Sequence, residues 1–446
     1  MFGRNALERL REWKNSPHRK PLVIRGARQV GKSTLIDEFG KEFGTYIHLN
    51  LDRAEDLALF EKELPVNELF EVILALKGKR KDMEDTLIFI DEIQNSATAI
   101  KSLRYFYEEL PQLHVVSAGS LLETMLNREA SFPVGRVEYL ALRPCSFQEF
   151  LGAVGQTALQ EMVNSVRVPE ALHSKVMSLF NRYSIIGGMP EVVAHYAEHH
   201  DLVALDNIYD SLLAGYSDDV EKYETRKDAR EVLRFLISGA WGYASERISF
   251  ERFGGSHYKS REIGDALRTL QKTMLLELAY PTTSPSLPLL PDLSKKPKLL
   301  FLDTGIVNHV AGIRSELLSK EDILDGWRGK TAEHIIGQEL FSQSTSVLDR
   351  RTFWVREARN SQAEIDWLYS SRAYGLVPIE VKSGHSGKLR SLHAFMEESP
   401  CSLALRFWNQ PLSSDTVKLP SGKSYRLYNA PYYYAGQVEK LLKAII

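Results

Sequence analysis

Eight consecutive residues, from Gly26 to Ser33, have the types and spacing that bind nucleotide phosphates. They match the pattern G-x-x-x-x-G-K-[ST] at every position. In this pattern the glycines let backbone N–H groups turn toward phosphate oxygens, the lysine reaches the β- and γ-phosphates, and the hydroxyl holds Mg²⁺. We therefore predict a site for ATP and Mg²⁺. Its residues are Gly26, Ala27, Arg28, Gln29, Val30, Gly31, Lys32, Ser33 and Thr34.

Two carboxylates, Asp91 and Glu92, follow the continuous apolar run 86–90. Such a run is typical of a strand buried on both faces of a parallel sheet, and ligands bind at the carboxyl ends of these strands. We predict that Asp91 binds Mg²⁺, directly or through water. Glu92 is expected to orient and deprotonate the attacking water. With Lys32, the pair predicts hydrolysis of ATP.

A third apolar run, 113–118, leads to Gly119 and Ser120. At that strand end, the Ser120 hydroxyl would contact the γ-phosphate or the attacking water. Ser120 also fits a helix N-cap, because Glu123 three residues later completes a capping-box pattern. The two roles are compatible, and both stay open.

Four residues near the C-terminus predict a separate constellation. Glu333 falls on an expected helix, Asp366 and Glu380 on adjacent strands, and Lys382 on the same side of its strand as Glu380. Carboxylates around one divalent cation, with a lysine beside it, are what phosphodiester hydrolysis needs. The same side chains would also form a buried ion-pair cluster in a fold that has lost this activity.

Hydrophobic patterning predicts the elements that must position these residues. Strand-like runs alternate with amphipathic helices over 1–145, which predicts a doubly wound parallel α/β sheet. A helical stretch follows over 146–225, broken at Gly187 to Pro190. Residues 299–446 return to an α/β pattern.

Residues 226–298 have the helix and strand order of a winged helix. The helix over 259–271 would be the recognition element for DNA. Its cations, with the lysine that follows it, are Lys259, Arg261, Arg268 and Lys272. The alternative is a helical lid used for packing or subunit contact, with a solvated charged face.

Composition limits the class of protein. The 446 residues are too many for one core and indicate several domains. The 56 basic and 58 acidic residues leave a net charge of −2, which gives no global nucleic-acid signature. Cys145 and Cys401 lie far apart and are expected to be core residues in a reducing cytoplasm. Since no apolar signal segment or run of 18 apolar residues is found, we expect a cytoplasmic protein without a membrane span.

The order of these motifs resembles the prokaryotic AAA-type ATPases that combine an AAA_14 core with a DUF4143 C-terminal region. The resemblance covers nearly the whole chain. It implies an AAA+-like P-loop ATPase core, a helical and winged-helix middle, and an end similar to PD-(D/E)xK nucleases. The segments that carry it are 26–33, 90–94, 118–120, 142–150, 187–190 and 379–384.

By this resemblance, Lys32 and Ser33 correspond to the Walker A pair, and Asp91 and Glu92 to Walker B. Ser120 corresponds to the polar sensor residue, which is usually Asn or Thr in other AAA proteins.

The resemblance also points to Arg136 as an arginine finger that contacts a neighbour's γ-phosphate, which would require a homo-oligomer. The alternative is a surface or substrate-loop arginine. Asp366, Glu380 and Lys382 match the nuclease core, and Glu333 matches it only loosely.

Taken together, the sequence predicts a Mg²⁺-dependent AAA+ ATPase that couples hydrolysis to conformational change, on or near DNA. One alternative is an ATP-gated, metal-dependent nuclease. Another is a nucleotide-switched scaffold in which a degenerate nuclease fold binds DNA or a protein. A metabolic kinase is disfavoured, because the glutamate after Asp91 indicates water as the nucleophile.

Overall fold

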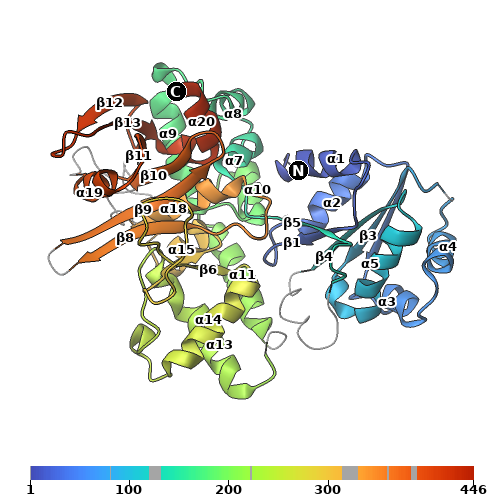
Figure 1. The fold of residues 1–446 in the computed structure, drawn as a ribbon. Coiled ribbons are helices and arrows are strands. Elements are labelled where there is room, and N and C mark those ends of the chain that lie inside the picture. The colour runs from blue at the N-terminus through green and yellow to red at the C-terminus, as the bar shows by residue number, and fades with distance from the viewer. Residues whose placement is uncertain are drawn as a thin grey trace.

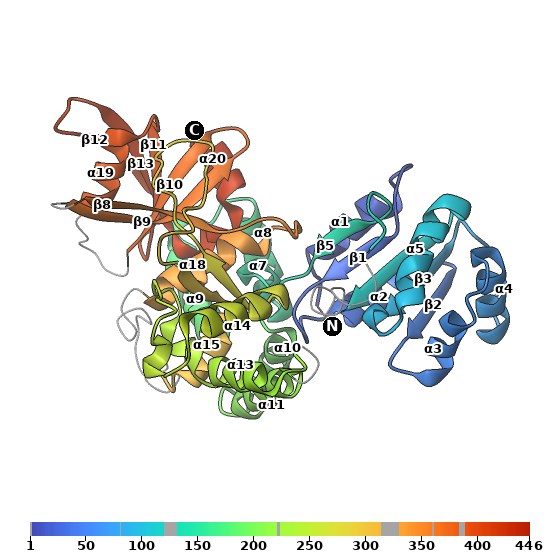
Figure 2. The ribbon, with the colours of Figure 1, turned by 60° about the horizontal axis from the view of Figure 1, so that its bottom comes forward.

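The computed structural model describes residues 2–80, 82–119, 132–220, 224–313, 330–358, 361–382 and 389–446. In two views, an N-terminal sheet domain stands at one side of a larger body formed by the rest of the chain (Figure 1 and Figure 2). Among the described helices, none is long and apolar enough to cross a membrane.

The N-terminal sheet has five parallel strands in the order β2-β3-β4-β1-β5. Successive residues of β1 enter two different cores: Leu22 and Ile24 pack with α1 and α2, and Val23 packs with α3, α4 and α5. Helices on both faces confirm the predicted doubly wound sheet. The elements are β1 (Leu22–Arg25), β2 (Thr45–Asn50), β3 (Thr86–Asp91), β4 (His114–Gly119), β5 (Glu138–Ala141), α1 (Ala6–Lys14), α2 (Lys32–Gly40), α3 (Ala54–Glu61), α4 (Val66–Leu76) and α5 (Ala97–Glu109).

A helical region follows, as the sequence predicts. It opens with a capping box, in which Ser146 accepts from the backbone N–H of Glu149 and the Glu149 carboxylate accepts from that of Ser146. The helices are α7 (Phe147–Ala153), α8 (Thr157–Asn164), α9 (His173–Ile186), α10 (Pro190–His199), α11 (Leu205–Asp218), α13 (Lys227–Gly239) and α14 (Ser260–Lys272).

A small antiparallel sheet of β6 (Leu276–Ala279) and β7 (Lys298–Phe301) comes after α14. An isolated bridge between Arg247 and Lys298 extends it by one residue pair. The pairing of β6 with β7 crosses the domain limit proposed between residues 298 and 299, so β7 packs with the helical region that precedes that limit.

The C-terminal sheet is mixed and has six strands in the order β12-β13-β11-β10-β9-β8. Only the pairs β10–β11 and β11–β13 are parallel. The elements are β8 (Thr352–Ala358), β9 (Ser361–Ser371), β10 (Gly375–Val381), β11 (Leu403–Trp408), β12 (Ser413–Lys418), β13 (Ser424–Pro431), α15 (Thr304–Val310), α18 (Lys330–Ser342), α19 (Arg390–Glu398) and α20 (Val438–Ile445). Both cysteines are free and buried, as predicted.

The glycine pair that ends α9 lies where three parts of the chain meet. Gly187 has a φ of 69°, a left-handed conformation that favours glycine. The Gly188 carbonyl accepts from the Cys145 N–H at 2.6 Å, and the Gly188 N–H donates to the Asp303 carboxylate at 2.5 Å. The pair therefore joins the end of the first sheet domain to the N-cap of α15.

Gly188→Ala is expected to lower the free energy of unfolding by about 3 kcal/mol. A Cβ at this position would lie 2.1 Å from the Cys145 carbonyl oxygen, which is backbone and cannot swing away. Chemical denaturation measures the change. The matched control is Gly215→Ala in α11, where a Cβ meets nothing within 4 Å and the better helix propensity should stabilise by about 0.5–1 kcal/mol. Equal stability of the two variants would contradict this account of the junction.

Candidate active site

The predicted phosphate loop lies between β1 and α2, as the motif requires. Gly31 ends the loop with a φ of 87°, which favours glycine. A Cβ on Gly26 would lie 2.6 Å from the carbonyl oxygen of Leu142, so the loop approaches the chain after β5 too closely for a side chain. The fold therefore explains both glycines of the motif.

Lys32 is buried and folded onto its own loop. Its Nζ donates to the carbonyl oxygens of Gly26 at 3.1 Å and Ala27 at 2.9 Å. Burial lowers the pKa of Lys32 to about 8, against the opposing influence of Glu92 and Asp91. The ammonium lacks a direct carboxylate partner among the described contacts, which leaves its charge available for phosphate oxygens.

The hydroxyl of Ser33 donates to the Asp91 carboxylate at 2.6 Å. This contact joins the phosphate loop to the end of β3 across 58 positions of sequence. The Nε2 of His48, on the neighbouring strand β2, lies 3.7 Å from the same carboxylate, and its Nδ1 lies 3.3 Å from Asp37. Although burial acts to raise it, contacts with His48 and Ser33 hold the pKa of Asp91 below its ordinary value. No sequence motif contains His48, which reaches Asp91 only through the pairing of β2 with β3.

Glu92 follows Asp91 in a left-handed conformation, with a φ of 50°. Its backbone N–H donates to the Asp91 carboxylate at 3.0 Å, and its own carboxylate accepts from Gln94 at 2.5 Å. Burial raises the pKa of Glu92. A carboxylate with a raised pKa beside the phosphate loop has the properties of a general base.

The loop opens into a cleft of about 1210 Å³. One wall is the phosphate loop with Thr34 and Glu92, another is the N-terminal segment with Phe2 and Leu7, and a third comes from α7, α8 and α10. The volume is sufficient for a nucleotide. The N-terminal wall was missed by the sequence analysis, because no motif marks it.

Residues 18–151 match the model of a family described as AAA domain. This part of the chain is an AAA domain. Its five-stranded sheet, phosphate loop and paired carboxylates are those of a P-loop ATPase. Two further models match beyond it: residues 177–317 match the domain of unknown function DUF8612, and residues 328–414 match the domain of unknown function DUF4143.

Solved structures similar to this chain include the Walker-type ATPase PABY2304 of Pyrococcus abyssi, at 15% identity and a TM-score of 0.44. That match covers 70% of this chain and 96% of the other. The ORC1 protein of Aeropyrum pernix, solved in complex with DNA, matches at 13% identity and a TM-score of 0.27, over 70% of this chain and 93% of the other. No curated protein matches this sequence.

Arg4 links the AAA domain's phosphate loop to the chain that leaves the sheet. Its guanidinium donates to the carbonyls of Val30 at 3.1 Å and Arg143 at 2.6 Å, and to the Glu149 carboxylate at 3.1 Å. These partners are up to 145 residues away, so no sequence signal identifies Arg4.

Helix α11 also reaches the phosphate loop. The guanidinium of Arg28 lies 2.5 Å from the Asp219 carboxylate, and the Tyr216 hydroxyl donates to the Arg28 carbonyl at 3.4 Å. Asp219 is buried, whereas Arg28 is partly exposed toward the cleft. The helical region and the AAA domain thus meet at a residue of the nucleotide motif.

Ser120 and Arg136 are two further residues that the sequence predicts for the site. Ser120 lies outside the residues that the structure describes. Arg136 precedes β5, whose Glu138 pairs with Leu22 at the start of β1, so Arg136 lies at the sheet edge opposite its own phosphate loop. Its Nε lies 2.8 Å from Glu108. A role of Arg136 as an arginine finger therefore requires a second copy of the chain and stays a proposal.

The predicted C-terminal constellation contains a cation that the sequence analysis missed. Lys298 of β7 is buried, and its Nζ lies 2.6 Å from Glu333 and 2.8 Å from Glu364. Burial acts to lower the pKa of Lys298, but the surrounding carboxylates outweigh it and hold that pKa above its ordinary value. An ammonium group therefore lies among these carboxylates.

The remaining predicted residues are neighbours of this group. The Asp366 carboxylate accepts from the Val381 N–H at 2.7 Å, and Lys382 donates to Glu380 at 2.5 Å. Burial raises the pKa of Glu380 to about 7, and Asp366 adds to the rise. Within the described ranges, no group of three or more His, Cys, Asp or Glu residues is arranged to hold a metal ion. The four predicted residues of this constellation take part in ion pairs and hydrogen bonds. They are Glu333, Asp366, Glu380 and Lys382.

Proposed function

We propose that this protein is a Mg²⁺-dependent ATPase of the AAA+ class, in which hydrolysis drives a conformational change. The observation that carries the proposal is the contact of Ser33 with Asp91 beside Lys32 and Glu92. Lys32, Ser33 and Glu92 line one cleft, and Asp91 contacts Ser33 beside it. Four residue types needed for ATP hydrolysis are therefore neighbours, although two of them are about 60 residues from the other two.

The residues present fit a magnesium ion. Ser33 Oγ and the Asp91 carboxylate offer hard oxygen atoms at one point, which is the donor set Mg²⁺ prefers. When bound, the ion would neutralise charge on the phosphates. Lys32 would exchange the Gly26 and Ala27 carbonyls for phosphate oxygens, and Glu92 would take a proton from the attacking water.

Coupling to the rest of the chain is supported by two contacts. Arg28 of the phosphate loop pairs with Asp219 of the helical region, so a nucleotide that repositions Arg28 would act on the chain that follows α11. Pro190, which begins α10, lies 3.6 Å from a Cβ placed on Gly31. A movement of the loop would therefore act on α10 and on the end of α11.

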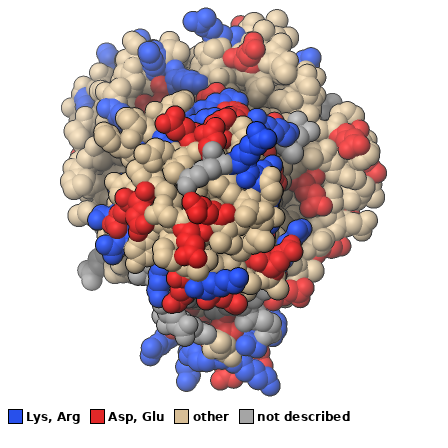
Figure 3. Space-filling model, turned by 90° about the vertical axis from the view of Figure 1, so that its right-hand side faces the viewer, with Lys and Arg blue, Asp and Glu red and all other residues tan. Residues whose placement is uncertain are grey.

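A DNA partner is the finer part of the proposal. Figure 3 shows basic and acidic side chains intermixed over the outward face of the AAA domain, so that face offers no continuous basic surface. The cations of α14 are the better candidates. Arg261 and Arg268 both contact Asp265, at 3.7 and 2.7 Å, and this carboxylate would compete with DNA phosphates. Lys259 and Lys272 flank the helix at its two ends.

The test is ATP hydrolysis by the full chain, with and without double-stranded and single-stranded DNA. Mg²⁺-dependent hydrolysis that DNA stimulates supports the whole proposal. Hydrolysis at the same rate with and without DNA supports the ATPase proposal. It would indicate that the conformational change acts on a protein partner. Tight ATP binding without turnover would reject the ATPase proposal in favour of a nucleotide-switched scaffold.

The affinity for ATP is expected to fall as the pH rises through about 8. Phosphates bind the ammonium form of Lys32, whose pKa burial lowers to about 8 in the nucleotide-free protein. Below that pH the group is already charged, and above it binding must take up a proton, so the affinity should decline by up to about tenfold per pH unit. Calorimetric titrations at about pH 7 and pH 9.5 measure the effect. The same affinity at both values would contradict the assignment.

A scaffold with a degenerate nuclease fold is the second candidate for the C-terminal region. The position of Lys298 between Glu333 and Glu364 favours it over an active nuclease, because an internal ammonium already balances these carboxylates. Metal-dependent DNA cleavage that Asp366→Ala or Lys382→Ala abolishes would instead support the ATP-gated nuclease.

Lys298→Met is expected to lower the free energy of unfolding by about 3–5 kcal/mol at neutral pH, because it leaves buried carboxylates without their partner. Burial raises the pKa of Glu333, and removing the cation raises it further. A raised pKa means that protonation relieves the cost, so the loss should shrink at about pH 5.

Denaturation curves at both pH values measure this loss. Lys295→Met is the matched control, since Lys295 pairs with Glu357 near the surface. Its substitution should change the free energy of unfolding by less than about 1 kcal/mol. A Lys298→Met variant as stable as this control would refute the ion-pair account.

A further inference from the structure

A second cavity lies behind the phosphate loop, where three parts of the chain meet. It has a volume of about 90 Å³. Its walls are the carboxyl ends of β1 and β4 and the chain after β5, the segment from α14 into β6, and α18 with the loop that follows it. It shares no lining residue with the nucleotide cleft. Gly26 is the one residue of the phosphate loop that lines it, so the cavity adjoins the nucleotide cleft without overlapping it.

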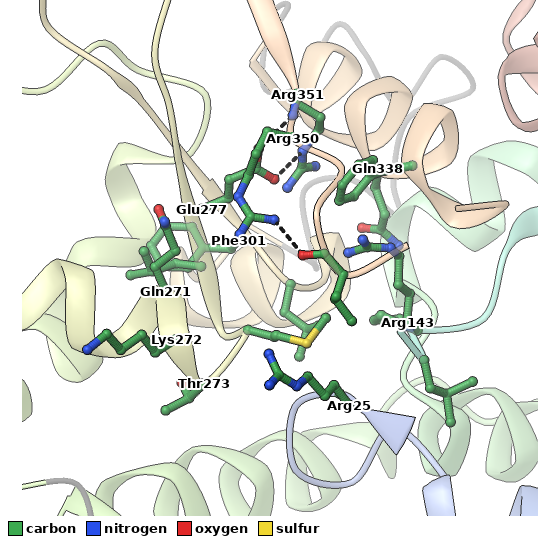
Figure 4. A pocket seen from close by; sticks show the side chains of 18 of the residues that line it. Arg25, Arg143, Gln271, Lys272, Thr273, Glu277, Phe301, Gln338, Arg350 and Arg351 are labelled. Carbon is green, nitrogen blue, oxygen red and sulfur yellow. Dashed lines mark hydrogen bonds and ion pairs between the residues drawn. The ribbon is translucent and has the colours of Figure 1, made fainter. Parts of the chain in front are cut away.

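The cavity is strongly cationic. Figure 4 shows Arg25 below it, Arg143 to the right, Arg350 and Arg351 above it and Lys272 to the left. Glu277 is the one carboxylate among the described lining residues, and it already accepts from the backbone N–H and the Nε of Arg351, at 2.7 and 3.0 Å. Arg143 and Arg350 are the lining cations whose described contacts are all with uncharged groups.

Two of the guanidinium groups, those of Arg143 and Arg350, are held in place by uncharged partners. Arg143 lies 3.6 Å above the ring of Phe341 and donates to the carbonyls of Ser344 and Ser346. Arg350 donates to the carbonyls of Val347 at 3.0 Å and Asp349 at 2.8 Å. These contacts orient the side chains without neutralising them.

The pKa of Arg143 is affected by the positive charge around it. Burial, followed by the nearby positive charge of Arg351, lowers the pKa of Arg143 to about 9, although Glu277 and Asp349 oppose the effect. An anion in the cavity would relieve this repulsion and accept hydrogen bonds from the guanidinium groups of Arg143 and Arg350.

We propose that this cavity is a binding site for one phosphate group of a small molecule, separate from the site of hydrolysis. Guanidinium forks match phosphate oxygens, and the fixed side chains lower the entropic cost of binding. A cavity of about 90 Å³ has room for a small tetrahedral anion. We favour a small molecule over a nucleic-acid strand because the cavity is small. Since the site touches the AAA domain, β6 and α18, an anion bound there would hold these three parts together.

The experiment is a calorimetric titration of the full chain with inorganic phosphate, with adenosine monophosphate, and with a short single-stranded oligonucleotide. All proteins carry Lys32→Ala, which is expected to weaken phosphate binding at the nucleotide motif about a hundredfold. We expect phosphate to bind in this background and Arg350→Gln to weaken it about tenfold, as the loss of one charge-assisted hydrogen bond predicts. Binding of adenosine monophosphate that is tighter than that of inorganic phosphate, and that Arg350→Gln also weakens, would identify a phosphate ester as the natural ligand.

Arg350 is exposed, so its substitution should leave the fold intact. Arg143→Gln should weaken the binding of inorganic phosphate further. The melting temperature of this variant checks that it folds. The control is Lys101→Gln, an equal loss of charge on exposed α5 far from the lining. The proposal is overturned if phosphate fails to bind in the Lys32→Ala background, or if Arg350→Gln and Lys101→Gln have the same affinity. Arg350-dependent binding of the oligonucleotide alone would also overturn it, in favour of a nucleic-acid contact.

Discussion

Glu92→Gln is expected to lower the turnover number for ATP by a factor of about 10²–10⁴, while ATP still binds. The carboxylate lies in the cleft beside Lys32, and burial raises its pKa toward the range of an effective general base. Glutamine keeps the size and still meets Gln94, but it cannot accept the proton of the attacking water. The substitution therefore separates the chemical step from binding.

Phosphate release under saturating ATP measures the turnover number, and calorimetry measures the affinity. Glu38→Gln is the matched control, because Glu38 lines the same cleft but pairs with exposed Lys41. We expect that variant to hydrolyse ATP normally. Turnover by Glu92→Gln at the level of this control would reject Glu92 as the base.

Lys32→Ala is expected to weaken ATP binding by about a hundredfold, equivalent to about 3 kcal/mol. Lys32 is the buried cation of the cleft, and its ammonium lies among loop carbonyls that it can exchange for phosphate oxygens. A charge in a site shielded from water interacts more strongly with phosphates than an exposed one. Alanine removes both the charge and the reach of the side chain.

Titration with a non-hydrolysable ATP analogue measures this affinity. Lys41→Ala serves as the control, since Lys41 follows the same helix but lies exposed at its far end. Its affinity should match that of the unaltered protein. If Lys32→Ala binds the analogue as tightly as Lys41→Ala does, the phosphate loop is not the nucleotide site.

Local sequence determined the centre of the candidate site. The phosphate loop is a contiguous motif whose glycines fix its backbone, and the strands beside it are apolar runs that can be recognised one at a time. Because parallel strands present their carboxyl ends at the same edge, Asp91 was predicted to lie close to the loop, and Ser33 does contact it. The five-stranded sheet was predictable for the same reason.

Tertiary structure decided what surrounds that centre. His48 contacts Asp91 only because β2 pairs with β3, and Asp219 meets Arg28 across 191 residues. No periodicity or spacing encodes such a contact, since it depends on how separate elements pack.

Tertiary structure also decided which residues meet in the C-terminal cluster and in the cationic cavity. The sequence placed Glu333, Asp366 and Glu380 together but gave no sign that Lys298 would lie among the carboxylates. No motif contains Lys298, and the pairing of β7 with β6 brings it there. Arg25, Arg143 and Arg350 likewise come from separate parts of the chain. A motif records chemistry along the chain, whereas burial and long-range pairing decide which charges finally face each other.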